Sequence, residues 1–103
     1  MSEIQRSAQL LADTLGKKNS DYTGGRGEFY NFEKSAQIAG IDPLDVMMSQ
    51  IGIKVTRIQA LRGGSAQNEP FIDSFLDLAG YAIIAHAYMS ALKANEDGFD
   101  YSN

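Results

Sequence analysis

Apolar residues recur every three or four positions in four separate stretches of the chain, which is the spacing of one face of an α-helix. The first stretch predicts a helix over residues 3–15, because Ser2 and Gln5 have the spacing of an N-terminal capping box. Gly16 follows directly and is expected to end this helix. Residues 17–28 then read KKNSDYTGGRGE, with three glycines and no apolar periodicity, so they predict a loop.

The next two stretches predict a short helix and a long one. The short helix begins near Phe29 and is expected to end at Gly40, since glycine is the common residue just past a helix C-terminus. Asp42 followed by Pro43 is a start signal, because aspartate caps free N–H groups and proline fits the first turn. The long helix that begins there is predicted to continue to about Arg62.

A second long helix is predicted from Glu69 to about Ala94, after a short polar turn. The fold class that follows is all-α: a four-helix, bundle-like arrangement with an antiparallel hairpin of two long helices, about 43–62 and 69–94. Residues 1–94 are expected to form a single α-helical domain, and residues 95–103 an acidic, flexible tail.

The hairpin also predicts which residues face each other. A turn centred near residues 65–66 places Lys54 opposite Asp77 in the antiparallel partner. The same register places Gly52 opposite Ala79 and Gly80, so we expect the two helices to approach closely where neither carries a bulky side chain.

Composition narrows the class of protein. The 103 residues are 44% hydrophobic and 21% charged, which is typical of one globular domain. The net charge of -4 argues against duplex DNA as a partner, because such binding needs a basic surface. The absence of cysteine excludes disulfides and zinc–thiolate sites and, with no signal-like N-terminus, leads us to expect a cytoplasmic protein.

The stretch from Leu78 to Leu92 is the longest apolar run of the chain, and it contains His86. We expect no membrane span, since this run is too short to cross a bilayer. It is apolar on almost every side of the predicted helix, which is more apolar surface than three other helices easily cover. The sequence therefore predicts a homo-oligomer, with a dimer favoured.

Three carboxylates follow one stripe of the last helix at intervals of four residues, Glu69, Asp73 and Asp77. One interpretation is a Mg²⁺ site, because Mg²⁺ prefers hard oxygen ligands. The alternative is structural: the first two carboxylates complement the helix dipole, and Asp77 forms an ion pair with Lys54.

The glycine-rich segment has two interpretations as well. Its positive side chains and exposed backbone N–H groups could bind phosphate, through Lys18 and Arg26 in particular, and a solvated loop is the alternative. Aromatic residues such as Tyr22, Tyr30 and Tyr81 could stack on a nucleobase, although aromatic side chains also serve as core or interface residues.

Several short strings, spread over about residues 17–90, together carry a resemblance. They are Lys18 to Gly25 (KNSDYTGG), Asn31-Phe32, Lys54 with Arg57, Asn68-Glu69, Asp73, Asp77-Leu78-Ala79 and Tyr81-Ala82. In this combination the chain resembles the phage nucleotide-modification-associated domain family. That family is distantly similar to the MazG-like all-α NTP pyrophosphohydrolases.

The resemblance implies a phage-encoded nucleotide-binding protein in the cytoplasm of an infected bacterium, acting in nucleotide metabolism or modification. It implies a ligand and phosphate site and a metal or ribose site in these positions: Lys18, Asp21, Tyr22, Arg26, Lys54, Arg57 and Tyr81 for the ligand, and Glu69, Asp73 and Asp77 with Glu33 for Mg²⁺.

Two departures from the family pattern change what it implies. Gly80 stands where the family has asparagine, and the preceding helix carries Lys54 and Arg57 where MazG-like enzymes have an ExxE carboxylate pair. Three functions therefore remain open: Mg²⁺-dependent hydrolysis of a nucleotide phosphoanhydride, non-catalytic sequestering of a nucleotide signal used in host defence, and a structural or protein-interaction module.

Overall fold

The computed structural model describes residues 1–23, 27–64 and 68–97, with side chains for all of these except 18–23 and 97. Four helices follow in order, and no strand lies within this part of the chain. Their bounds are α1, Glu3–Thr23; α2, Tyr30–Ala39; α3, Pro43–Leu61; and α4, Glu69–Asp97. The prediction of an all-α fold is confirmed.

The predicted boundaries around α2 and α3 are confirmed by the backbone. Gly40 ends α2 in the left-handed conformation, with φ of 71°. Asp42 caps α3, where the Leu44 N–H donates to the Asp42 carboxylate over 2.8 Å, and Pro43 occupies the first turn.

The start of α1 is as predicted, whereas its end is not. The Ser2 N–H donates to Gln5 Oε1 over 2.8 Å and the Gln5 N–H donates to Ser2 Oγ over 3.1 Å, which is the predicted capping box. The prediction that Gly16 ends the helix is wrong, because α1 continues to Thr23. Glycine ends a helix when it turns left-handed, and Gly16 does not have a positive φ. Much of the predicted loop is therefore helical.

At the other end of the chain, α4 begins as predicted and runs slightly further. Asn68 caps it by accepting a hydrogen bond from the Phe71 N–H over 3.2 Å. The helix ends at Asp97, so the first residues of the expected tail belong to α4. The remainder, 98–103, lies outside the described residues.

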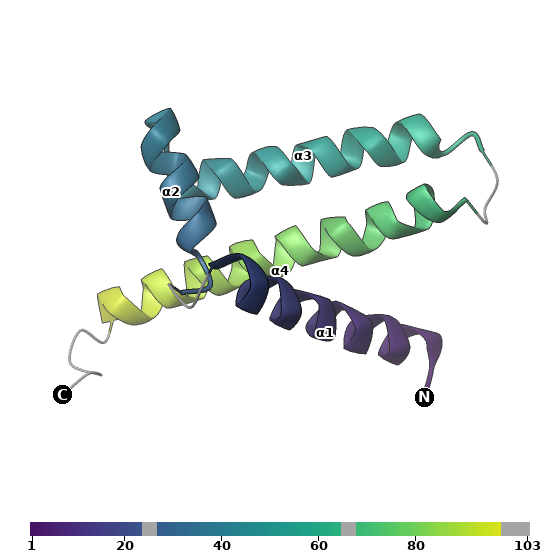
Figure 1. Ribbon diagram of the computed structural model, residues 1–103, viewed down its shortest axis with the longest axis horizontal. Helices are drawn as coiled ribbons and strands as arrows, with labels where there is room; N and C mark the ends of the chain where they lie inside the picture. The colour runs from purple at the N-terminus through teal and green to yellow at the C-terminus, as the bar shows by residue number, and fades with distance from the viewer. Residues whose placement is uncertain (24–26, 65–67, 98–103) are drawn as a thin grey trace.

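The two long helices lie side by side and run in opposite directions, with α2 across the start of α3 (Figure 1). Lys54 Nζ lies 3.2 Å from Asp77 Oδ2, which confirms the predicted register of this hairpin. Helix α1 touches α4 and then diverges from it toward the N-terminus (Figure 1). The molecule is accordingly open, measuring 53 × 37 × 26 Å.

The expected close approach at the glycines is corrected. A Cβ added at Gly52 would meet nothing within 4 Å, so Gly52 has no packing role against α4. Gly80 is buried against α1, since a Cβ there would lie 3.6 Å from Leu11 Cδ1 and 3.6 Å from Leu15 Cδ2. Because Gly80 has no side chain, α1 can pack closely against α4 at this position.

The length and apolar composition of α4 are relevant to the expectation that the chain has no membrane span. The stretch Glu69–Glu96 is long enough to cross a bilayer, and an 18-residue window within it is apolar enough to do so by composition. The core helix of a soluble protein passes the same test, but such a helix is mostly buried, whereas only 6% of this window is buried. The expectation stays a prediction, and the exposure of α4 needs an explanation.

Candidate functional site

All four helices contribute to one cavity of about 480 Å³. Ligand-binding cavities commonly fall between about 300 and 1000 Å³. Its lining combines apolar side chains, most of them from α1 and α4, with polar groups from all four helices and aromatic rings from α2, α4 and the residue before α2. The lining residues are Leu11, Thr14, Leu15, Glu28, Phe29, Asn31, Phe32, Ser35, Val46, Gln50, Lys54, Leu76, Asp77, Gly80, Tyr81, Ile83, Ile84 and Ala87.

Aromatic rings form one wall of this cavity. Phe32 of α2 and Tyr81 of α4 meet edge to face, with ring centroids 6.3 Å apart and planes at 88°. Phe29, the residue before α2, meets Tyr88 in the same manner at 5.4 Å. Such contacts fix the rings and hold α2 against α4. The apolar faces of Phe29, Phe32 and Tyr81 are thus presented by a fixed scaffold.

The charged part of the cavity is the ion pair between the two long helices. Lys54 is the only cation among the described lining residues, and its side chain is 22% exposed. Asp77 accepts it at 3.2 Å and is 39% exposed. Partial shielding strengthens this pair relative to a fully solvated one. An anion that enters the cavity therefore meets a cation already held in place on α3.

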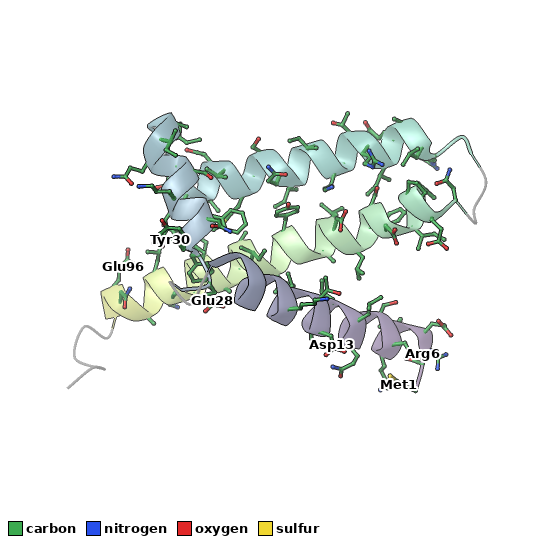
Figure 2. All side chains as sticks on the ribbon, viewed as in Figure 1. Met1, Arg6, Asp13, Glu28, Tyr30 and Glu96 are labelled. Carbon is green, nitrogen blue, oxygen red and sulfur yellow. The ribbon has the colours of Figure 1, made fainter. Side chains whose placement is uncertain are left out.

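Uncharged polar groups complete the lining. Asn31 and Ser35 are exposed at its rim, and Gln50 lies on α3 one turn before Lys54. Amides both donate and accept hydrogen bonds, which suits the mixed edge of a nucleobase. Glu28 adds a carboxylate where the chain enters α2, close to α1 and α4 (Figure 2).

The structure brings together part of the predicted site. Lys54, Asp77 and Tyr81 all line the cavity. Arg57 and Asp73 are exposed and are not among its lining residues.

The predicted Mg²⁺ ligands do not gather into a metal-binding group. Among the residues described here, no three His, Asp or Glu side chains are arranged so that they could hold a metal ion. Of the four carboxylates proposed from the sequence, Asp77 lines the cavity, whereas Glu33, Glu69 and Asp73 are exposed outside it. These residues do not fit a metal centre, so no chemistry is derived through one, and Mg²⁺ binding stays a prediction.

Four other predicted residues are not tested. The side chains of Lys18, Asp21 and Tyr22, which belong to the last turns of α1, lie outside the described residues, as does Arg26.

Sequence reasoning missed several lining residues that the fold supplies. Gln50 could have been found, because it precedes Lys54 by four positions and so shares its helical face. Glu28 lines the cavity, whereas Glu33, the acidic residue named from the sequence, does not. Thr14 and Ser35 carry no local signal, because only the packing of α1 and α2 brings them here.

A second polar feature lies beyond the aromatic wall. Partial burial raises the pKa of the Tyr88 phenol above its ordinary value of 10.0, and the negative charges of Asp42 and Glu33 raise it further. Tyr88 therefore stays protonated at neutral pH and acts as a neutral packing group against Phe29. His86, on the same helix, is exposed in the single chain.

Comparisons with known proteins identify no relative of this chain. None of the protein-family models, curated proteins or solved structures searched matches this chain.

Proposed function

We propose that this chain binds a nucleotide in the cavity where its four helices meet. One observation carries the proposal: Lys54 is held at 3.2 Å by Asp77 in a cavity that is also walled by the rings of Phe32 and Tyr81. A nucleotide needs a cation for its phosphate and an apolar surface for its base, and both lie within this one site.

The ion pair leaves the Lys54 ammonium group able to exchange its Asp77 partner for a phosphate. Lys54 presents three N–H donors, of which Asp77 engages a part. A phosphate that approaches Lys54 competes with Asp77 and shares the ammonium group, so binding trades one charge-assisted contact for another. The carboxylate lowers the affinity for an anion and keeps the lysine ordered when the cavity is empty.

The rest of the lining suits the nucleoside portion. The aromatic rings offer surfaces that can contact any of the nucleobases. The amides of Asn31 and Gln50 can distinguish one base from another through hydrogen bonds to the base edge. The cavity volume of about 480 Å³ is in the range of small-molecule sites. The resemblance to nucleotide-modification-associated domains points to the same class of ligand.

Two functions are consistent with this proposal. A phosphoanhydride hydrolase converts the bound nucleotide in the presence of Mg²⁺, whereas a sequestering protein returns it unchanged, so the fate of the bound ligand separates them. The structural or protein-interaction module is the alternative to the proposal, because it binds no nucleotide at all.

The test is a thermal-shift screen of the intact chain against nucleoside mono-, di- and triphosphates and cyclic nucleotides, with and without Mg²⁺. A ligand of the native state stabilises by RT ln(1 + [L]/Kd), about 2.7 kcal/mol at a hundredfold excess over Kd. We expect at least one nucleotide to raise the melting temperature of the wild type. Mass analysis of the recovered ligand then reports whether it was cleaved.

Two variants test whether the nucleotide binds in the cavity. Lys54→Met should weaken the shift, since it removes the cation of the lining. Arg57→Met is the matched control: Arg57 is exposed, sits on the same helix and does not line the cavity. Equal shifts in Lys54→Met, Arg57→Met and the wild type would contradict binding at this site.

A further inference from the structure

A regular and mostly apolar seam runs along the side of α4. Six of its residues follow one another at intervals of three, four, three, four and three, the spacing of the a and d positions of a coiled coil. They are Ile72, Phe75, Ala79, Ala82, His86 and Met89. Five are exposed and Ala79 is half-buried, and no Asp, Glu, Lys or Arg interrupts the seam. Ile72, Phe75 and Met89 retain 47%, 50% and 46% of their surface.

This seam lies on the side of α4 that its neighbours leave open. Helix α1 contacts α4 at Gly80, and α3 contacts it at Asp77. At about 3.6 residues per turn, the centre of the seam is turned about half a circle from the middle of the arc between these two contacts. The α4 residues that line the cavity are centred on that arc, so the centres of the seam and of the cavity lie on opposite sides of α4.

The surface area of the chain shows that burial is incomplete. A monomer of 11.2 kDa is expected to expose about 5700 Å², whereas this chain exposes 7481 Å². A standard protein interface removes about 800 Å² from each partner. The excess of about 1800 Å², taken over the whole chain, is larger than the area that one partner buries in a standard interface.

We propose that this seam binds the same seam of a second copy, with the two α4 helices antiparallel around a two-fold axis between Gly80 and Tyr81. The seam is symmetric about that point, so Ala79 faces Ala82 of the second copy. Small residues then meet at the centre, where the helices approach, and the large ones meet toward the ends.

Charge favours the antiparallel direction. Exposed Lys93 continues the seam by one position, and antiparallel pairing brings it near Asn68 and Glu69 at the start of α4 in the second copy. Parallel pairing would instead set Lys93 against Lys93. Opposite charges across the ends of a helix pair fix its direction.

A lipid bilayer is a poorer occupant of the same surface. Helix α3 lies alongside α4 and joins it through Lys54 and Asp77, and it also carries exposed Asp45 and Arg57. Inserting α4 into a bilayer would take these charged groups along, which is expensive. A second copy covers the seam without moving them.

The test is the molar mass of the intact chain at micromolar concentration by light scattering after size exclusion. We expect twice the 11.2 kDa of one chain for the wild type and for Ala91→Glu. Ala82→Glu should give the mass of one chain, because it places a carboxylate at the centre of the seam. Ala91 is an exposed alanine of the same helix, nine residues on and half a turn round, which makes it the matched control.

A charge pair tests the register. In Ala79→Lys combined with Ala82→Glu, each lysine faces a glutamate of the second copy, so we expect the double mass to return. This variant also controls for misfolding of Ala82→Glu, because it carries the same substitution. As an independent measurement on the wild type, the melting temperature should rise with protein concentration.

Three results would overturn the proposal: a wild type of single-chain mass, an Ala82→Glu mass equal to that of the wild type, or sedimentation of the wild type with phosphatidylcholine vesicles. The seam and the nucleotide site are tested separately. Ala82→Glu should retain the nucleotide shift of the wild type, and Lys54→Met should retain its mass.

Discussion

Lys54 and Asp77 show how far reasoning from single residues extends. Their pairing at 3.2 Å follows from the length of the turn between two antiparallel helices, which fixes the register from the sequence alone. A different argument, the interval of four residues along one helix, put Asp73 and Glu69 beside Asp77 in a metal site, yet both are exposed outside the cavity. Residues four apart share a face only approximately, so over two turns the stripe leaves the cavity.

The two mid-helix glycines give a stability prediction at this scale. Gly80→Ala should raise the free energy of unfolding by about 0.5–1 kcal/mol, because alanine favours a helix and its Cβ would lie at an ordinary 3.6 Å from Leu11 and Leu15. Gly80→Leu should lower it by about 1–3 kcal/mol through overpacking. Urea unfolding at one protein concentration measures both.

Gly52→Leu is the control, since nothing lies within 4 Å of its Cβ position. We expect it to leave the free energy of unfolding unchanged or higher, as leucine is the better helix former. If Gly80→Leu proved as stable as Gly52→Leu, the contact of α4 with α1 would be disproved.

Individual helices differ in how firmly they are attached. The first ten residues are exposed, and Met1 and Arg6 lie at the end of α1 that points away from α4 (Figure 2). Helix α3 by contrast contains fully buried Met47 and packs against both α2 and α4. An N-terminal cap should therefore contribute more to the stability of the fold on α3 than on α1.

Removing each cap tests this difference. Asp42→Ala should lower the free energy of unfolding by about 1 kcal/mol, because it leaves the Leu44 N–H without its acceptor at the start of a packed helix. Ser2→Ala should change it by less than about 0.3 kcal/mol, since the first turn of α1 can fray without global unfolding. Denaturant unfolding compares the two, and Asp42→Asn controls for loss of charge.

The stability contributed by Tyr88, near the junction of α2, α3 and α4, should depend on pH. Partial burial, with the negative charges of Asp42 and Glu33, raises the pKa of Tyr88 above 10.0, so the folded chain holds this proton more tightly than the unfolded chain. The stability that Tyr88 contributes is present below pH 10.0 and is lost as the pH rises through its folded pKa.

Absorbance at 295 nm measures this ionisation directly. The difference titration between the wild type and Tyr88→Phe should have its midpoint above pH 10.0, and Glu33→Gln should move it lower. A midpoint at or below 10.0 would contradict the partial burial of Tyr88 near these negative charges.

Helix boundaries were predictable where a residue has one physical role. Asp42 with Pro43 and the left-handed Gly40 act locally, and both predictions are confirmed. Gly16 was misassigned, because a glycine either ends a helix or continues it, and its sequence neighbours did not decide between the two.

At the scale of the whole molecule, the fold class was predictable and the cavity was not. Helical periodicity predicts four helices whatever their arrangement, but Asn31, Ser35 and Glu28 reach the site only because α2 crosses the hairpin. The seam of α4 was hidden in the sequence for a related reason. From Leu78 to Leu92 the helix is apolar on nearly every side, and only the positions of α1 and α3 show which side is uncovered.

The most direct test of nucleotide binding in this cavity is the affinity of one stabilising nucleotide for the wild type, Lys54→Met and Asp77→Asn by titration calorimetry. We expect Lys54→Met to weaken binding by about tenfold or more, the effect of losing a hydrogen bond to a charged group. Asp77→Asn should strengthen it by up to about fivefold, because it releases Lys54 from a partly exposed ion pair. Unchanged affinity in both variants would contradict phosphate binding at Lys54.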